Sequence, residues 1–156
     1  MIYACCGLPR CGKSTFTQKL VEFRPRHVIV SGDSIRLALT NERYNAQAEG
    51  TVHSIKDVMM KALIITGHHI VYDGTNTTID SVRKLEKIAK QYNQDMMWFI
   101  FDVDKEICKE RAIKTEQSDL LPVIEKMATQ LNETRQYILD NHPYRIIKDN
   151  NDTIIH

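Results

Sequence analysis

The sequence predicts an α/β domain with a parallel central sheet of about five strands. Short apolar runs, rich in β-branched and aromatic residues, recur along the chain at residues 2–6, 27–31, 69–73, 96–101 and 144–147. Such runs are typical of strands that are buried on both faces. Segments with the apolar spacing of a helix lie between them, and a glycine-containing turn follows the first run. Strands that alternate with helices indicate a parallel sheet covered by helices on both faces.

The helices are expected between the strands, with boundaries set mainly by proline and glycine. Pro25 ends the first helix, because it pushes Arg24 out of helical geometry, whereas Pro122 suits the first turn of the long helix. Residues 40–50 are polar, show no regular spacing of apolar residues and are interpreted as a loop or short helix. Residues 115–120 are interpreted as a polar lid, and residues 153–155 as a last short strand. Helices are expected at residues 13–23, 51–66, 79–92, 104–114 and 121–140, and a short helix through residues 37–39 is expected after the segment 32–36.

Length and composition are those of an ordinary globular protein. The 156 residues suit a single domain over residues 1–156, with a lid at about 111–122, and 42% are hydrophobic and 26% charged. No apolar run approaches the length of a membrane span. Four cysteines without metal-ligand spacing favour a reduced, cytoplasmic setting. The net charge of +1 is not the global basic footprint of a nucleic-acid binder, although residues 1–36 hold six basic against two acidic side chains.

The turn after the first strand matches the phosphate-binding P-loop pattern G-x-x-x-x-G-K-[ST] at every fixed position. Its glycines let the backbone fold back so that N–H groups cradle phosphate oxygens, assisted by the positive end of the following helix. In this pattern Lys13 reaches the β- and γ-phosphates and Ser14 offers its hydroxyl to Mg²⁺. The sequence therefore predicts an ATP and Mg²⁺ site formed by Gly7, Pro9, Arg10, Cys11, Gly12, Lys13, Ser14 and Thr15.

Two carboxylates lie at the ends of the second and third strands. Asp33, with Arg36 three residues later, could accept the proton of an attacking hydroxyl while Arg36 grips a phosphate on the acceptor; equally, Asp33 could be an N-cap. Asp73 could hold a metal-bound water, or could instead build an Asx turn. Because ligands of parallel sheets bind at the carboxyl ends of the strands, these groups are expected to meet in one cleft.

Further polar residues are weaker candidates for the same cleft. Asn76 could bind the acceptor or a phosphate. Arg111 and Lys114 lie one helical turn apart beside the polar lid, where a cation could neutralise charge on a transferring phosphoryl group; both could equally belong to a solvated helix face. The pair His68 and His69 has no ligand-spaced partner and is interpreted as structural.

These motifs resemble the kinase domain of the phage-type polynucleotide 5′-kinases, within the wider group of small P-loop kinases that includes zeta-toxin-like enzymes. The resemblance rests on residues 7–15, 33–36, 73–76, 101–103 and 121–124. It implies a P-loop NTPase kinase-type three-layer sandwich with a helical lid, and makes Lys13 and Ser14 the ATP and Mg²⁺ site. It also implies that Asp33 is the general base for a 5′-hydroxyl, that Arg36 binds the acceptor's 3′-phosphate, and that Asp73 lies at the acceptor site.

The chain departs from this family in two places. The family's lid carries an arginine that contacts the donor phosphates, but residues 115–117 include none, so Arg111 or Lys114 must serve or the lid works differently. The sequence is also expected to leave no room for the phosphatase domain of the bifunctional phage enzymes. The expected function is transfer of the γ-phosphate of ATP, or of another NTP, to a hydroxyl, foremost the 5′-hydroxyl of a nucleic-acid end. The alternatives are a kinase of a small acceptor, such as a nucleoside, nucleotide or nucleotide sugar, and an ATPase or switch module.

Overall fold

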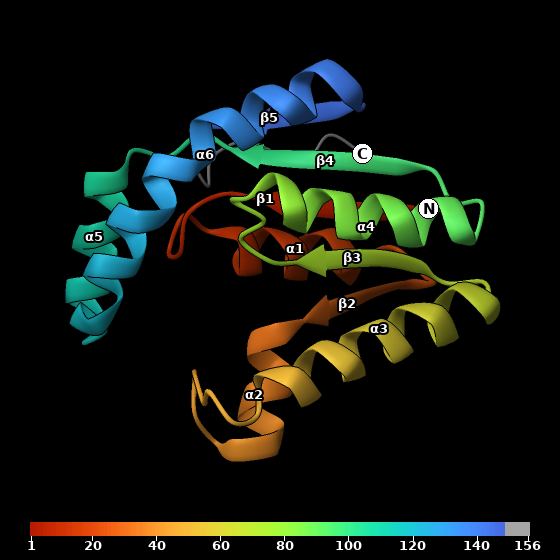
Figure 1. Cartoon of the computed structure of the whole chain (residues 1–156), viewed down its shortest axis with the longest axis horizontal. Coiled ribbons are helices and arrows are strands. Elements are labelled where there is room, and N and C mark those ends of the chain that lie inside the picture. The colour runs from red at the N-terminus through yellow and green to blue at the C-terminus, as the bar shows by residue number, and fades with distance from the viewer. Residues whose placement is uncertain (149–156) are drawn as a thin grey trace.

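The computed structural model describes residues 1–148. Its sheet has five strands, all parallel, in the order β2-β3-β1-β4-β5 (Figure 1). The strands are β1 (Ile2–Cys6), β2 (His27–Ser31), β3 (His69–Asp73), β4 (Met96–Phe101) and β5 (Tyr144–Ile147). The predicted parallel sheet is therefore confirmed, and each of these strands occupies the apolar run that predicted it. The additional strand expected at residues 153–155 lies outside the described residues.

The helices also follow the predicted order. They are α1 (Lys13–Glu22), α2 (Gly32–Thr40), α3 (Glu49–Ile65), α4 (Ile79–Gln91), α5 (Lys105–Lys114) and α6 (Leu121–Asn141), with a short 3-10 helix η1 (Ser118–Leu120) before α6. Pro122 lies in the first turn of α6, where its missing N–H is tolerated. The segment 40–50 divides into the end of α2, a loop, and the first residues of α3. Its final residues are helical because they begin the amphipathic run that follows.

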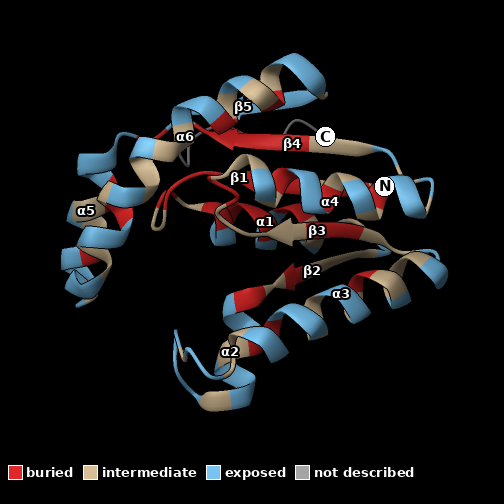
Figure 2. Cartoon of the chain, viewed as in Figure 1, coloured by how far each residue is buried: buried red, intermediate tan, exposed pale blue. Residues whose placement is uncertain are grey.

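Two apolar cores cover the two faces of the sheet. On one face α1 packs against β4, with the ring of Phe16 4.8 Å from that of Phe99 and 5.5 Å from that of Phe101. On the other face, α3, α4 and the end of α6 enclose Trp98 and Ile70. Figure 2 shows the buried residues gathered along the central strands. The molecule thus has the three layers that the alternation of strands and helices predicted.

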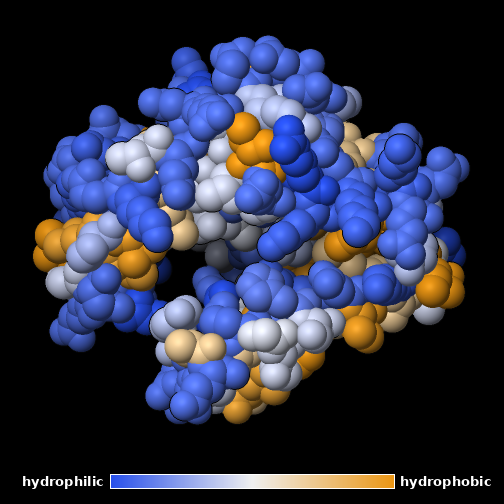
Figure 3. All heavy atoms as spheres, in the orientation of Figure 1, coloured by the Kyte–Doolittle hydropathy of each residue, from blue (hydrophilic) through white to orange (hydrophobic). Residues whose placement is uncertain are grey.

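The carboxyl ends of all five strands point to one edge of the molecule, the left edge in Figure 1. The loop after β1, helix α2 and the loop after β3 meet there, and the backbone N–H of Gly7 donates to Thr75 O at 2.9 Å. Figure 3 shows the surface hollowed at this edge, between α5 and α2. Within residues 1–148, none of the helices combines the length and the apolar character needed to cross a bilayer.

Candidate active site

The P-loop joins β1 to α1 through backbone geometry that its glycines permit. Gly12 has a φ of 103°, in the left-handed region, and forms the N-cap of α1 without a side-chain cap. A Cβ atom on Gly7 would lie 2.8 Å from Phe101 Cβ and 2.9 Å from Cys11 Sγ, so the loop has no room for a larger residue there. The uncapped N–H groups at the start of α1 are suited to an anion.

Lys13 lies beneath this loop rather than in solvent. Its Nζ donates to the carbonyl of Leu8 at 2.6 Å and to that of Gly7 at 3.1 Å, and lies 3.6 Å from Cys11 Sγ. The residue is only 8% exposed. The charge of the buried ammonium group is balanced by the dipoles of these carbonyl groups. A phosphate anion would form stronger, charge-assisted hydrogen bonds with it. Lys13 is thus placed to exchange these carbonyls for a ligand phosphate.

Ser14 and Asp73 connect the P-loop helix to the end of β3. Ser14 Oγ donates to Asp73 Oδ2 at 2.7 Å. Burial raises the pKa of Asp73, an effect opposed by the hydrogen bond from Ser14 and the charge of Lys13. The hydroxyl and the carboxylate are oxygen ligands of the kind that Mg²⁺ prefers. Because residues 1–148 contain no cluster of three or more His, Cys, Asp or Glu side chains that could hold a metal, phosphate oxygens and water would have to complete such a site.

Asp33 lies in the first turn of α2, at the end of β2. The N-cap of α2 is Ser31, whose side chain accepts from the backbone N–H of Ser34 at 3.4 Å. The hypothesis that Asp33 is the N-cap is therefore wrong. Its carboxylate instead accepts from Arg36 Nη1 at 2.6 Å, and 79% of its side chain is exposed. This places an accessible carboxylate, anchored by a guanidinium group, at the rim of the strand ends.

Ser14, Asp33 and Asp73 line one pocket. The pocket has a volume of about 370 Å³ and extends from these residues along β2 between α1 and α2. The remaining wall is largely apolar or uncharged: Thr17, Gln18, Ile29, Ser31, Ser34, Ile35, Leu37, Ala38 and Met59. The carboxylates at the ends of β2 and β3 and the hydroxyl of the P-loop thus face one space, as expected from the parallel topology.

The other candidate residues are distributed around this pocket. Asn76 is buried, and its Nδ2 donates to Cys5 O at 2.7 Å, so its amide joins the loop after β3 to β1. Arg111 Nη1 donates to Arg10 O in the P-loop at 3.4 Å, which brings the end of α5 to the nucleotide-binding loop. Lys114, in the last turn of α5, is exposed. The role of Asn76 as an acceptor ligand and that of Arg111 as the lid cation stay predictions.

Sequence reasoning missed Glu49, which forms the second contact of Arg36. Glu49 Oε1 lies 2.5 Å from Arg36 Nε, and Glu49 Oε2 lies 2.9 Å from Arg36 Nη2. The hydrogen bond from Arg36 lowers the pKa of Glu49 and, reciprocally, raises that of the guanidinium. A glutamate just ahead of an apolar helical run was the available signal, but its partner on another helix is a tertiary contact that spacing does not reveal.

The fold and this arrangement define the class of protein: an α/β domain of the P-loop kinase type. The chain belongs to the AAA domain family (AAA_33), whose model matches residues 2–141. The resemblance to small P-loop kinases is thereby confirmed. Among curated protein sequences, none matches the chain.

Solved structures share the fold at low sequence identity. A chain of the Pnkp1/Rnl/Hen1 RNA repair complex has a TM-score of 0.77 and 23% identity, over 87% of this chain and 45% of that chain. This chain therefore spans less than half of that protein. A chain of the PezAT toxin–antitoxin system of Streptococcus pneumoniae has a TM-score of 0.70 and 16% identity, over 99% of this chain and 71% of that chain. The tunicamycin resistance protein of Deinococcus radiodurans has a TM-score of 0.61 and 16% identity, over 90% of this chain and 83% of that chain.

Proposed function

We propose that this protein is an ATP-dependent phosphotransferase that moves the γ-phosphate to a hydroxyl group. One observation carries the proposal: a P-loop hydroxyl, Ser14, shares a pocket with two carboxylates, Asp33 and Asp73, at the ends of three adjacent strands. A donor site and a proton acceptor that face one space are what transfer to an alcohol requires.

The residues present fit a magnesium–nucleotide donor. The uncapped N-terminus of α1 and the P-loop N–H groups would hold the phosphates, and Lys13 would leave the carbonyls of Gly7 and Leu8 to bind them. The hydroxyl of Ser14, which donates to Asp73, would hold the metal of the donor. Bound Mg²⁺ would supply neutralisation of the phosphate charge. The cluster therefore has the donor types that ATP and Mg²⁺ need.

Asp33 is proposed as the proton acceptor. Its exposed carboxylate would take the proton of the acceptor hydroxyl as the hydroxyl oxygen bonds to the γ-phosphorus and the bond from this phosphorus to the β,γ-bridging oxygen breaks, releasing ADP. Arg111, which contacts the P-loop at Arg10 O, is proposed as the cation that closes over the transferring group. Catalysis would then consist mainly of positioning and charge stabilisation.

The acceptor we propose first is the 5′-hydroxyl of a nucleic-acid end. The support is the likeness in fold to a chain of an RNA repair complex, together with the Asp33–Arg36 pair, in which the arginine can contact an acceptor phosphate. In this proposal Arg36, Asp73 and Asn76 lie on the acceptor side. The four free cysteines, all buried, are consistent with a reducing, cytoplasmic location.

A small-molecule acceptor is the second candidate. A pocket of about 370 Å³ with a mostly apolar or uncharged wall is the size of a small-ligand site. The net charge of +1 gives no broad attraction for a polyanion. The tunicamycin resistance protein, which shares this fold, is a further reason to include small hydroxyl compounds.

The test is transfer of labelled γ-phosphate from ATP to a panel of acceptors. The panel holds a 5′-hydroxyl DNA oligonucleotide, the corresponding RNA, a nucleoside, a nucleotide sugar, and a reaction without acceptor. Label on the oligonucleotides supports the first candidate, and the rate should then fall with added salt. Label on the nucleoside or nucleotide sugar alone supports the second. Phosphate release without any acceptor, and no transfer in any reaction, would contradict the proposed function and favour an ATPase or switch module.

A further inference from the structure

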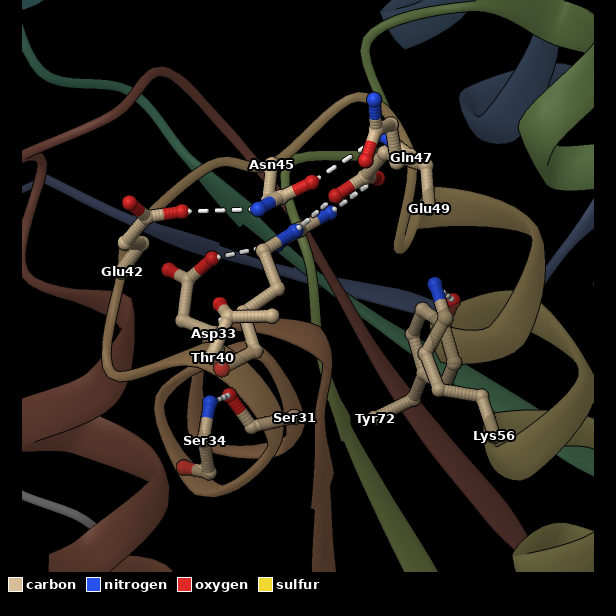
Figure 4. Close-up of polar contacts among 11 residues, drawn as sticks. Ser31, Asp33, Ser34, Thr40, Glu42, Asn45, Gln47, Glu49, Lys56 and Tyr72 are labelled. Carbon is tan, nitrogen blue, oxygen red and sulfur yellow. Dashed lines mark hydrogen bonds and ion pairs between the residues drawn. The ribbon is translucent and has the colours of Figure 1, made fainter.

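Arg36 is held from two helices at once. On α2, its Nη1 donates to Asp33 Oδ1 at 2.6 Å. From α3, the two carboxylate oxygens of Glu49 accept from Nε at 2.5 Å and from Nη2 at 2.9 Å. The guanidinium group thus joins carboxylates of two helices, Asp33 on α2 and Glu49 on α3, both labelled in Figure 4. A bidentate contact of this kind fixes the plane of the guanidinium as well as its position.

The two contacts differ in how well they are shielded. The side chains of Arg36 and Glu49 are 17% and 21% exposed, whereas that of Asp33 is 79% exposed. We therefore expect the Arg36–Glu49 contact to be the stronger one, because exposed ion pairs contribute little. The orientation of Asp33 therefore depends on an arginine that Glu49 holds in place.

The backbone of α2 and that of α3 both favour the contacts of Arg36 with Asp33 and Glu49. A Cβ atom on Gly32 would lie 3.3 Å from Arg36 Nη1, so the guanidinium passes closely over a glycine. Glu49 lies in the first turn of α3, where the helix dipole favours a carboxylate. The preceding loop is ordered by hydrogen bonds from Asn45 Nδ2 to Glu42 and from Gln47 N to Asn45 Oδ1 (Figure 4).

We propose that Glu49 is a positioning residue of the acceptor site: it fixes Arg36 so that Asp33 faces the acceptor hydroxyl. This inference rests on the proposed function, because it assigns Glu49 to the same reaction. Three N–H groups of Arg36 are engaged by the two carboxylates, and the guanidinium has five, so two can still face the acceptor. Glu49 does not contact the reacting atoms and acts only through Arg36.

The test compares Glu49→Gln and Glu49→Asp with the matched control Glu42→Gln. Glu42 lies in the loop before α3 and accepts from Asn45. Its substitution by glutamine removes the same charge, keeps an oxygen that can accept from Asn45, and leaves the contacts of Arg36 in place. The probe is transfer from labelled ATP to the acceptor from the panel that the wild type uses best. We expect Glu49→Gln to lower kcat by about tenfold to a hundredfold, since small misplacements of reacting groups have effects of this size. The KM for ATP should change little, Glu49→Asp should recover part of kcat, and Glu42→Gln should resemble the wild type.

A second readout follows Arg36 without any ligand. In a ¹H–¹⁵N NMR spectrum, the Nε–H of Arg36 should exchange slowly with water in the wild type and in Glu42→Gln, because it donates to Glu49. We expect that protection to be lost in Glu49→Gln while the melting temperature stays near that of Glu42→Gln. A mutant that merely failed to fold would instead lose its melting transition and its affinity for ATP as well.

The outcomes separate this inference from the proposed function. If the wild type transfers phosphate and Glu49→Gln matches its kcat, the positioning role is overturned while the proposed function stands. If Glu49→Gln binds a phosphate-bearing acceptor more tightly at undiminished kcat, Glu49 competes for Arg36 and the proposal is also overturned. If the wild type transfers phosphate to no acceptor, the proposed function fails first and the inference fails with it.

Discussion

At the scale of single residues, Lys13 combines a structural contact with a proposed catalytic one. Its ammonium donates to the carbonyls of Gly7 and Leu8 and is almost completely buried. Lys13→Met should reduce phosphate transfer by about a hundredfold or more, since loss of one preorganised donor has an effect of that size. It should also lower the free energy of unfolding by about 1–3 kcal/mol, because two carbonyls lose their partner.

Kinetics and urea unfolding of Lys13→Met test both expectations. Lys19→Met, which removes an exposed cation from the same helix, is the matched control and should leave transfer and stability near those of the wild type. Full activity of Lys13→Met would show that the P-loop does not hold the donor as proposed.

Asp73 gives a pH dependence whose sign follows from its environment. Burial raises the pKa of Asp73 above its ordinary 3.8, so the folded state binds this proton more tightly than the unfolded state does. As the pH rises from the ordinary pKa of Asp73 to the raised one, the folded state holds this proton more than the unfolded state does. The contribution of Asp73 to the free energy of unfolding therefore falls as the pH rises. Asp73→Asn removes that loss, since its amide oxygen can still accept from Ser14.

The free energy of unfolding of Asp73→Asn relative to the wild type should therefore increase between about pH 3 and about pH 7. Urea unfolding at several pH values measures this difference, in which the other titrating groups cancel. A difference that stays constant, or that decreases with pH, would contradict the assigned environment of Asp73.

Individual residues were predictable where a motif fixes their chemistry and unpredictable where a tertiary contact does. The pattern around Lys13 and Ser14 specifies a loop and a helix start, and the structure has both. Asp33 could be read equally as a cap or as a base, because the capping role depends on where the helix starts after β2. The helix starts two residues earlier, and Ser31 is the cap. Glu49 gave no local sign of its contact with Arg36, since the two belong to different helices.

At the scale of elements, α6 is attached to the loop after β3 by one buried hydroxyl. Thr134 Oγ1 donates to Thr77 O at 2.8 Å, and Thr134 is 1% exposed. Thr134→Val should lower the free energy of unfolding by about 1–3 kcal/mol, because the shape is kept while a buried carbonyl loses its partner. Thr129→Val, on an exposed face of the same helix, should change stability by less than about 0.5 kcal/mol. Equal effects in urea unfolding would show that Thr134 does not link α6 to this loop.

The elements themselves were largely encoded by local signals. β-Branched and aromatic runs specified the strands, and Pro25, Gly67 and Pro122 lie at or beside helix boundaries. The segment 40–50 was ambiguous because it is polar and lacks a period. Its last residues are helical through continuity with the amphipathic remainder of α3, which packs Val52 and Met60 into the core.

At the scale of the whole molecule, the strand order decides which residues meet. The order β2-β3-β1 brings together the carboxyl ends of three strands, which carry Asp33, Asp73 and the P-loop, three segments distant in sequence. Alternation of strands and helices predicted a parallel sheet and therefore a common edge, but not which strands are neighbours. The pocket along β2 and the contact of Arg111 with the P-loop depend on that order and on packing.

The role of Asp33 as the proton acceptor is tested by measuring ATP binding and phosphate transfer separately in Asp33→Asn. ATP affinity is measured by calorimetry, and single-turnover transfer is measured with the best acceptor of the panel. Asp57→Asn, an exposed carboxylate of α3, is the matched control. We expect Asp33→Asn to bind ATP within about twofold of the wild type and to transfer about a hundredfold or more slowly, as loss of a general base implies. Transfer at the wild-type rate by Asp33→Asn would show that Asp33 is not the proton acceptor and that the proposed phosphotransfer mechanism is wrong.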